Sequence, residues 1–309
     1  SDDADARAKA GLLYHLGHAA EGDGLALLVF GVVVLAAMAA FCGVLGRQYL
    51  RLMTTKRGVK KAVYHAKVTQ KSSLRKALLR RELLHLASSP AYLLNCALGS
   101  VMLVVAGGVM LVQAEKIYTQ ASELLPADIL PLLLCAMVCV GLATNSLAAP
   151  SVSLEGKTLW LIQSLPVTAW QALRAKLDLH LLLTAVPAVF CALCGGLAFR
   201  LSLIELLLIL LVVLLFSCFT ALFDLMAGLL WPKLHWTNET AVVKQSLFSA
   251  VAIFGGWAAG LLLSVGGFLL AAVLPVAAAL LLCAAVLALA DALLLNWVKG
   301  KGCRRFETL

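Results

Sequence analysis

Four side chains that could carry a proton or an ion stand inside long apolar stretches of the chain, namely Glu205, Asp224, Asp291 and His180. Ionisable residues within such stretches often mark a transport path or a proton relay. Glu205 and His180 lie near segment ends. Asp224 and Asp291 lie within about two helical turns of the ends that the charge pattern assigns to the cytoplasm. No Lys or Arg accompanies them at that depth, so the pattern favours helix packing or interfacial roles over proton coupling.

A short stretch, Gly156-Lys157-Thr158, matches the end of a phosphate-binding loop. The full pattern needs a glycine at position 151 and a β-strand before the loop, because backbone amides at a strand-to-helix turn cradle the phosphates. This chain has Ser151 there, between apolar segments that are expected to be helices. The sequence therefore predicts neither a nucleotide site nor an enzyme.

Residues that ligate metals or form disulfides are scattered. Among the six histidines only His15 and His18 stand three residues apart, and the H-E-x-x-H pattern is absent, so a metal site is not favoured. Eight of the nine cysteines lie inside apolar segments, Cys303 being the exception. They are expected to be packing residues rather than a disulfide framework.

The composition indicates a membrane protein. Of the 309 residues 62% are hydrophobic and 13% are charged, and the mean hydropathy is +0.97. A soluble domain would be roughly 45–50% apolar and about 25% charged. The net charge of +9 arises from basic residues beside apolar segments, which fits membrane topology better than nucleic-acid binding.

Seven apolar segments are long enough to cross a bilayer, which takes roughly 20 helical residues. They lack period-2 alternation, so the predicted fold is an all-α polytopic membrane protein with seven transmembrane helices. The predicted spans are Gly24–Gly46, Ala91–Gln113, Ala127–Ala149, Leu177–Phe199, Leu201–Leu230, Ser246–Gly266 and Leu269–Trp297.

The distribution of positive charge predicts the orientation of these spans. Of the 25 Lys and Arg residues, 21 fall on alternate loops, and only Arg7, Lys9, Lys116 and Arg200 remain for the other side. Loops rich in Lys and Arg stay in the cytoplasm. We therefore expect a multi-pass protein of the bacterial cell membrane, with the N-terminus outside and the C-terminus in the cytoplasm.

These elements predict five regions along the chain. Residues 1–23 form an acidic extracytoplasmic segment, and 24–46 an additional transmembrane helix. Residues 47–89 form a basic cytoplasmic loop, 90–297 a six-span core, and 298–309 a basic cytoplasmic tail.

The basic loop is expected to contain a helix that connects it to the core. Ser72 or Ser73 would cap this helix, which would lie at the level of the lipid headgroups. Ser89 followed by Pro90 then predicts the start of the next span.

The polar stretch 151–177 is expected to be a structured hinge at the membrane surface, within a loop at 150–176. Ser153 is predicted to cap a short helix that has Glu155 in its first turn, and Pro166 to end it. Thr168 and Gln171 form a capping-box pattern for a second helix.

Three motifs in order resemble permeases of the ABC-2 type in the ABC exporters of Gram-positive bacteria. Each motif alone is short, but together they extend from about residue 75 to the C-terminus. The first motif runs from Arg81-Glu82 to Ser88-Ser89-Pro90-Ala-Tyr92. The second motif is Glu155-Gly156-Lys157, followed by Leu159-Trp160-Leu161 and Ser164-Leu165-Pro166-Val167. The third motif is Pro232-Lys-Leu-His-Trp236-Thr-Asn238-Glu239, followed by Val243-Lys244-Gln245.

The resemblance implies the C-terminal half of a fused permease, in which six spans form the exporter core. It implies that the loop between the second and third core spans docks on a cytoplasmic ATPase, which holds the ATP and Mg²⁺ that this chain does not bind. The coupling residues would be Glu155, Gly156, Lys157, Trp160, Leu165 and Pro166, and the second cytoplasmic loop would contribute Lys233, Trp236, Asn238 and Glu239.

In this interpretation Trp160 and Leu165 enter a groove of the ATPase, and Lys157 and Glu155 form a polar rim. The other expected partners are membrane lipid and a second transmembrane half, supplied by a missing N-terminal half or by another copy. Nucleic acid is not an expected partner.

The predicted function is therefore that of a permease subunit that exports a peptide or lipid-like substrate, with ATP hydrolysis in a separate subunit. One alternative is a proton-coupled secondary transporter that uses Asp224 and Asp291. Another is a membrane scaffold or regulator that transports nothing.

Overall fold

The computed structural model describes residues 73–309, together with eight helical residues between positions 28 and 43. The chain divides into two compact units, Ser1–Thr69 and Gln70–Leu309. Nearly all of the first unit lies outside the described residues, including His15, His18 and most of the predicted span Gly24–Gly46. The following description concerns the second unit.

The second unit is helical, and no β-strand occurs in residues 73–309. The helices are α3 (Leu74–Ser88), α4 (Pro90–Cys96), α5 (Leu98–Val112), α6 (Ala114–Leu124), η1 (Ala127–Ile129), α7 (Leu130–Ala143), α8 (Ala148–Ser153), η2 (Gly156–Thr158), α9 (Leu159–Ser164), α10 (Ala169–Ala198), α11 (Leu203–Leu230), α12 (Glu239–Lys244), α13 (Leu247–Ala271), α14 (Val276–Trp297), η3 (Val298–Gly302) and α15 (Cys303–Glu307).

Five helical stretches of the described residues are long and apolar enough to cross a membrane. They are Ala127–Ser153, Ala169–Ala198, Leu203–Leu230, Leu247–Ala271 and Val276–Glu307. The pair α4 and α5, bent by 47°, makes a sixth if it counts as one span. The chain is thus an all-α polytopic membrane protein, and the predicted seventh span lies largely outside the described residues.

Two predicted spans relate differently to their helices. The span predicted from Leu177 lies inside a longer helix that begins at Ala169, so the second helix predicted from the capping box of Thr168 and this span are one helix. The span expected to begin at Leu269 begins at Val276. The preceding helix continues to Ala271, and Pro275, which has an extended ψ of 144°, stands immediately before the next helix.

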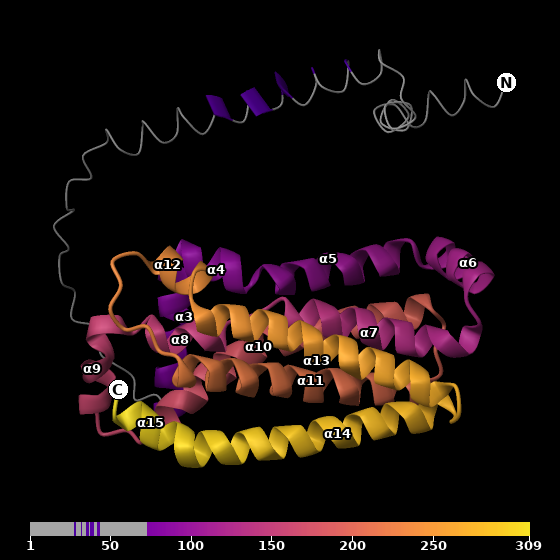
Figure 1. Ribbon diagram of the computed structural model, residues 1–309. Helices are drawn as coiled ribbons and strands as arrows, with labels where there is room; N and C mark the ends of the chain where they lie inside the picture. Colours follow the sequence, from indigo (N-terminus) through magenta and orange to yellow (C-terminus); the bar gives the residue numbers. More distant parts are fainter. Residues whose placement is uncertain (1–27, 29–31, 33–34, 37, 40–41, 44–72) are drawn as a thin grey trace. The chain divides into compact units, whose positions relative to one another are not determined.

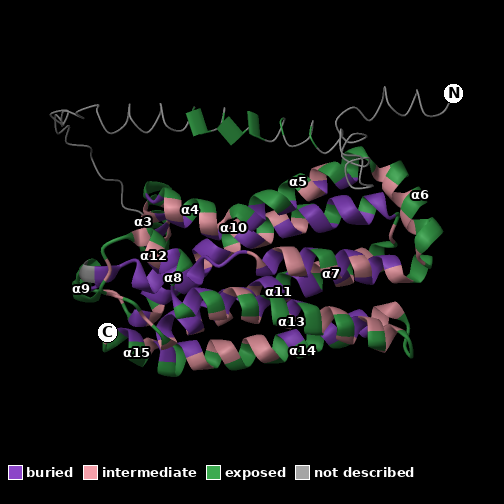
Figure 2. Ribbon diagram, turned by 45° about the horizontal axis from the view of Figure 1, so that its top comes forward, coloured by how far each residue is buried: buried purple, intermediate pink, exposed green. Residues whose placement is uncertain are grey.

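Helix α11 lies at the centre of the bundle. It packs against α7, α8, α10, α13 and α14, and Figure 1 shows these long helices side by side. All six residues of α8 are buried, which Figure 2 shows as an almost continuous buried patch. The outward faces of α5, α13 and α14 expose many Leu and Val side chains, as expected for surfaces that contact lipid.

The bundle has two distinct ends. One carries α3, α9, α12 and α15, and we call it the loop end; the other carries α6 (Figure 1). The loop end contains the motifs within the described residues that the sequence analysis predicted to be cytoplasmic.

Helix starts follow partly from local sequence. Ser89 accepts a hydrogen bond from the Tyr92 amide and Pro90 follows it, as predicted. The predicted capping box of Thr168 and Gln171 is also present. Ser73 occupies the cap position of α3, but its side chain makes no capping bond.

The cap predicted at Ser153 is wrong. Ser153 is the last residue of α8, and its hydroxyl accepts a hydrogen bond from the backbone N–H of Lys233, at an N–O distance of 2.9 Å. The hydroxyl that was expected to cap the next helix therefore makes a tertiary hydrogen bond instead.

Candidate functional site

The candidate site is the connection between α8 and α10, which we call the coupling loop (residues 154–168). Its backbone turns at Gly156, whose φ is +50°, a conformation that glycine adopts without steric cost. Helix α9 follows and ends at Ser164, two residues before Pro166. The loop therefore forms a short folded segment at the end of the bundle.

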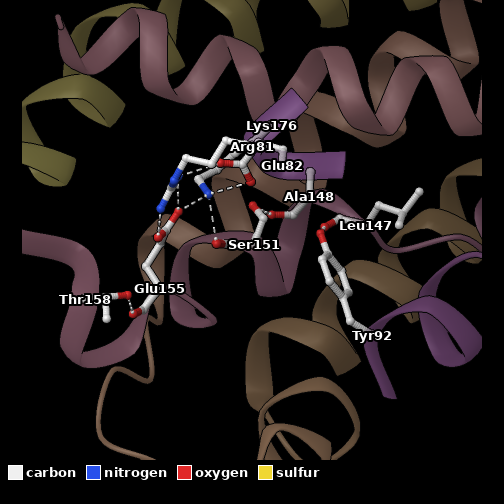
Figure 3. A network of polar contacts seen from close by, with 9 residues as sticks. All are labelled: Arg81, Glu82, Tyr92, Leu147, Ala148, Ser151, Glu155, Thr158 and Lys176. Carbon is white, nitrogen blue, oxygen red and sulfur yellow. Dashed lines mark hydrogen bonds and ion pairs between the residues drawn. The ribbon is translucent and has the colours of Figure 1, made fainter. Parts of the chain in front are cut away.

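Glu155 fixes the start of this loop to two helices. Its carboxylate accepts a hydrogen bond from Nη1 of Arg81 on α3 at 2.9 Å and one from Nη2 of the same guanidinium. It also accepts one from Nζ of Lys176 on α10 at 2.8 Å. Only 3% of Glu155 is exposed, and Lys176 is buried as well, whereas the side chain of Arg81 is 32% exposed (Figure 3).

Lys176 is the centre of this network. It is 1% exposed, and its ammonium group donates to Glu82 on α3 at 3.1 Å, to Glu155, and to the backbone carbonyl of Ser151 at 3.0 Å. Glu82 is bonded to Arg81 as well, at 2.9 Å. We call Arg81, Glu82, Glu155 and Lys176 the ion network (Figure 3).

The network determines the protonation of Glu155. Burial alone would raise the pKa of its carboxyl. The positive charge of Lys176 and the hydrogen bonds from Arg81 and Lys176 outweigh that effect and lower the pKa from 4.5 to about 2. Glu155 is therefore ionised at neutral pH, and two cations compensate its charge.

A second ion pair joins the same two helices. Arg75 on α3 donates to both carboxylate oxygens of Asp178 on α10, at 2.7 and 2.9 Å. This geometry is bidentate, but Arg75 is mostly exposed, so water screens the pair. The stronger attachment of α3 to α10 is therefore the buried ion network.

The loop between α11 and α13 packs on the start of the coupling loop. The indole N–H of Trp236 donates to the backbone carbonyl of Ser153 at 2.8 Å. Asn238 caps α12, and the carboxylate of Glu239 accepts a hydrogen bond from the hydroxyl of Ser89. Lys233 contributes its backbone N–H to Ser153. The four residues expected in this loop thus join α8, α12 and the start of α4 into one folded end.

Helix α9 presents apolar side chains to its surroundings. Trp160 is 65% exposed, Leu161 48% and Leu165 43%, whereas Leu159 and Ile162 on the opposite side are buried. The buried side packs against the cluster that includes Leu173 and Phe306. We call Trp160, Leu161 and Leu165 the α9 patch.

The structure separates the residues that were expected to act together in coupling. Trp160, Leu165 and Pro166 are exposed. Gly156 is buried against the ring of Trp236, and Lys157 lies in η2. Glu155 was expected at an exposed polar rim, and this was wrong. Its carboxylate is buried, where it is bonded to Arg81 and Lys176.

The intramembrane polar residues have three different environments. Glu205 forms a capping box with Ser202 at the start of α11, so it stabilises a helix end. Asp291 lines a cavity of about 430 Å³ beside Arg174 and Lys299, and its two carboxylate oxygens have no hydrogen-bond partner. Asp224 lies 3.6 Å from Nδ1 of His180, measured from Oδ2.

Sequence reasoning missed Glu82, Lys176 and the pairing of His180 with Asp224. Glu82 is the single acidic residue among twelve Lys and Arg in the loop 47–89, and that isolation was a usable signal. Lys176 had no such signal, since it was counted as one of three positive loop residues. A buried lysine inside a span becomes recognisable only when its carboxylate partners are in place.

Within the residues that the structure describes, no group of three or more His, Cys, Asp or Glu could hold a metal ion. Comparison with known proteins found no match to the chain among protein-family models, curated protein sequences or solved structures. Fold and site geometry therefore define the chain as an all-α multi-pass membrane protein with an ion-paired loop end.

Proposed function

We propose that the chain is the transmembrane permease subunit of an ATP-driven exporter of the ABC-2 type, and that its coupling loop docks on a separate cytoplasmic ATPase. The observation that carries this proposal is the α9 patch. Three large apolar side chains are exposed on a folded loop. Glu155, near the start of this loop, forms ion pairs with residues of two helices, α3 and α10. A partner protein that covers the patch would remove them from water, which is favourable for apolar surface.

The ion network supports a mechanical role for this loop. A force applied to α9 would reach Glu155 within a few residues, and Glu155 is bonded to both Arg81 on α3 and Lys176 on α10. Bonds between buried charges tolerate little displacement, because separating them leaves charges uncompensated. We therefore infer that α3, the coupling loop and α10 move together, so that docking at α9 tilts a transmembrane helix.

The roles within the loop differ from those that the resemblance implied. The docking residues are Trp160, Leu165 and Pro166, with Leu161 added from its exposure. Glu155 and Gly156 instead give the loop its shape. The spans would move a peptide or lipid-like substrate, and ATP with Mg²⁺ would bind the ATPase alone.

The test is purification of the full chain from its native membrane, followed by measurement of associated ATP hydrolysis. Trp160→Glu should remove both the nucleotide-binding subunit and the hydrolysis, because a carboxylate would be buried at the interface centre. Leu124→Glu is the matched control, since Leu124 on α6 is 81% exposed at the opposite end of the bundle.

Two results would contradict the proposal. The first is a wild-type preparation without associated ATP hydrolysis, which both a proton-coupled transporter and a scaffold would give. The second is normal hydrolysis in Trp160→Glu, which would place the ATPase contact elsewhere.

A further inference from the structure

The chain is unwound between α7 and α8, at residues 144–147, and buried side chains stabilise this break. The backbone N–H and hydroxyl of Ser100 both donate to Oδ1 of Asn145, at 2.8 and 3.0 Å. The hydroxyl of Tyr92 donates to the backbone carbonyl of Leu147 at 2.6 Å (Figure 3). Breaks within a membrane span persist only where the freed backbone groups find such partners.

The first amide of α8 is bonded to a histidine. The N–H of Ala148 donates to Nδ1 of His180 at 3.3 Å, so Nδ1 carries a lone pair and no proton. Nε2 lies 3.5 Å from the hydroxyl of Thr220, which donates its own proton to the carbonyl of Ser217 at 3.0 Å. These bonds assign the ring proton to Nε2, and His180 is neutral.

Asp224 faces the side of this ring that has no proton. Its Oδ2 lies 3.6 Å from Nδ1 and has no hydrogen-bond partner, and Ser146 Oγ at the break is also unpartnered. His180 is 0% exposed and Asp224 2%. An ionised carboxylate here would have the Ser146 hydroxyl as a donor but no cation beside it. A proton on Oδ2 would instead point toward Nδ1, whose lone pair would then face both this proton and the N–H of Ala148.

Within the described residues, the only ion-pair partner of Asp224 is His180. Helix α14 carries Cys283 and Asp291, and Arg174 on α10 and Lys299 in η3 line the cavity of Asp291. Lys176, one turn before His180 on α10, is committed to the ion network together with Glu82 and Glu155. On α4 the titratable groups near Asp224 are Tyr92 and Cys96. Helices α5 and α13 contain no ionisable residue, and α7 contains only Cys135 and Cys139.

We propose that Asp224 and His180 form a proton-binding site that stabilises the break between α7 and α8. The ligand is one exchangeable proton on Oδ2 of Asp224, directed toward Nδ1 of His180. Its loss would leave a carboxylate facing a lone pair and would weaken the contact of α8 with α10 and α11. This site goes beyond the proposed function and is independent of ATPase docking, so either can fail without the other.

Infrared spectroscopy of the full chain in lipid nanodiscs tests the site directly. The wild type at neutral pH should show the C=O stretch of a protonated, buried carboxyl group, which is lost in Asp224→Asn. Asp291→Asn is the matched control, because Asp291 is a buried carboxyl outside the site, and the Asp224 band should survive in it. A spectrum that Asp224→Asn leaves unchanged would show an ionised Asp224 and overturn the proposal.

A second measurement tests the partner and the consequence. His180→Gln should shift the Asp224 band, because the carboxyl loses its acceptor; an unshifted band in a folded variant would overturn the pairing. The wild type should lose thermal stability as the pH rises above about 4, where an unfolded Asp ionises while the folded one keeps its proton. Asp224→Asn should lack this dependence, because its amide donates at every pH, and an identical pH dependence in both proteins would also overturn the proposal.

Discussion

Lys176 illustrates at the scale of one residue how a membrane helix can contain a charge. Its ammonium group has two carboxylates and one backbone carbonyl as partners, and the side chain is 0% exposed. Taking two opposite charges out of water costs several kcal/mol per ion, so their mutual bonds do little more than compensate. The arrangement therefore confers geometric specificity at least as much as stability.

Removal of this cation should be costly. Lys176→Met would leave Glu82 and Glu155 buried with Arg81 as their remaining cation, and we expect a loss of about 3–5 kcal/mol in the free energy of unfolding. Denaturation of the purified protein in mixed micelles measures it. Lys244→Met is the control, because Lys244 is exposed on α12, and it should change stability by less than about 0.5 kcal/mol. Equal losses in both variants would rule out the network as a source of stability.

Acid should weaken the attachment of the coupling loop. The pKa of Glu155 is lowered from 4.5 to about 2 in the folded protein. Its contribution is therefore fully present above pH 4.5 and is lost as the pH falls toward 2. The shift corresponds to roughly 3 kcal/mol.

The measurement is the stability difference between the wild type and Glu155→Gln at each pH. The difference should be largest at neutral pH and should shrink as the pH falls from 4.5 to 2. A difference that stays constant over this interval would mean that Glu155 is not ionised in the network at neutral pH.

Single residues were predictable from sequence where their partners are local. Ser89 and Thr168 cap helices by bonding to amides three residues ahead, and short-range patterns encode such contacts. Glu155 bonds to Arg81, 74 residues away, and Lys176 to Glu82, 94 residues away. Sequence patterns do not predict contacts over such separations along the chain, so the ion network was not predicted.

At the scale of elements, the coupling loop depends on one left-handed residue. Gly156 has a φ of +50°, and a Cβ added there would lie 3.0 Å from Nε1 of Trp236, the atom that bonds to Ser153. The turn therefore fixes both the direction of α9 and the contact of the coupling loop with the loop between α11 and α13.

Gly156→Ala should destabilise this corner. A left-handed conformation costs a residue with a Cβ about 1–2 kcal/mol, and crowding of Trp236 adds to that. Thermal denaturation measures the effect, and Gly108→Ala is the control. An added Cβ at Gly108 meets nothing within 4 Å, so this helical substitution should be neutral or stabilising by up to about 1 kcal/mol. Equal behaviour of both variants would show that the turn is not constrained.

The elements themselves were largely predictable. Apolar length located the five spans that the described residues contain, because a membrane helix must satisfy its backbone bonds internally. The 47° bend between α4 and α5 and the break after Ala143 were not expected. The break falls on the polar residues Thr144, Asn145 and Ser146 inside an otherwise apolar segment. Tertiary contacts of Asn145 with Ser100 and of Leu147 with Tyr92 stabilise it.

At the scale of the whole molecule, the two ends of the bundle should face opposite sides of the membrane. The loop end carries Trp160 and α6 carries Leu124, both largely exposed. In a cysteine-free background, a membrane-impermeant maleimide should label Leu124→Cys in intact cells. It should label Trp160→Cys only after permeabilisation. The reverse pattern would overturn the orientation predicted from charge.

The ion network also bears on the order in which the protein can be assembled during synthesis. Glu82 and Glu155 leave the ribosome before Lys176, which lies in the first third of α10. An unpaired lysine within a membrane helix makes insertion less favourable. The helix that contains Lys176 thus enters the bilayer most readily when both carboxylates are already present at the bilayer surface. Nascent chains that stop short of this lysine would carry two carboxylates with Arg81 as their single cationic partner.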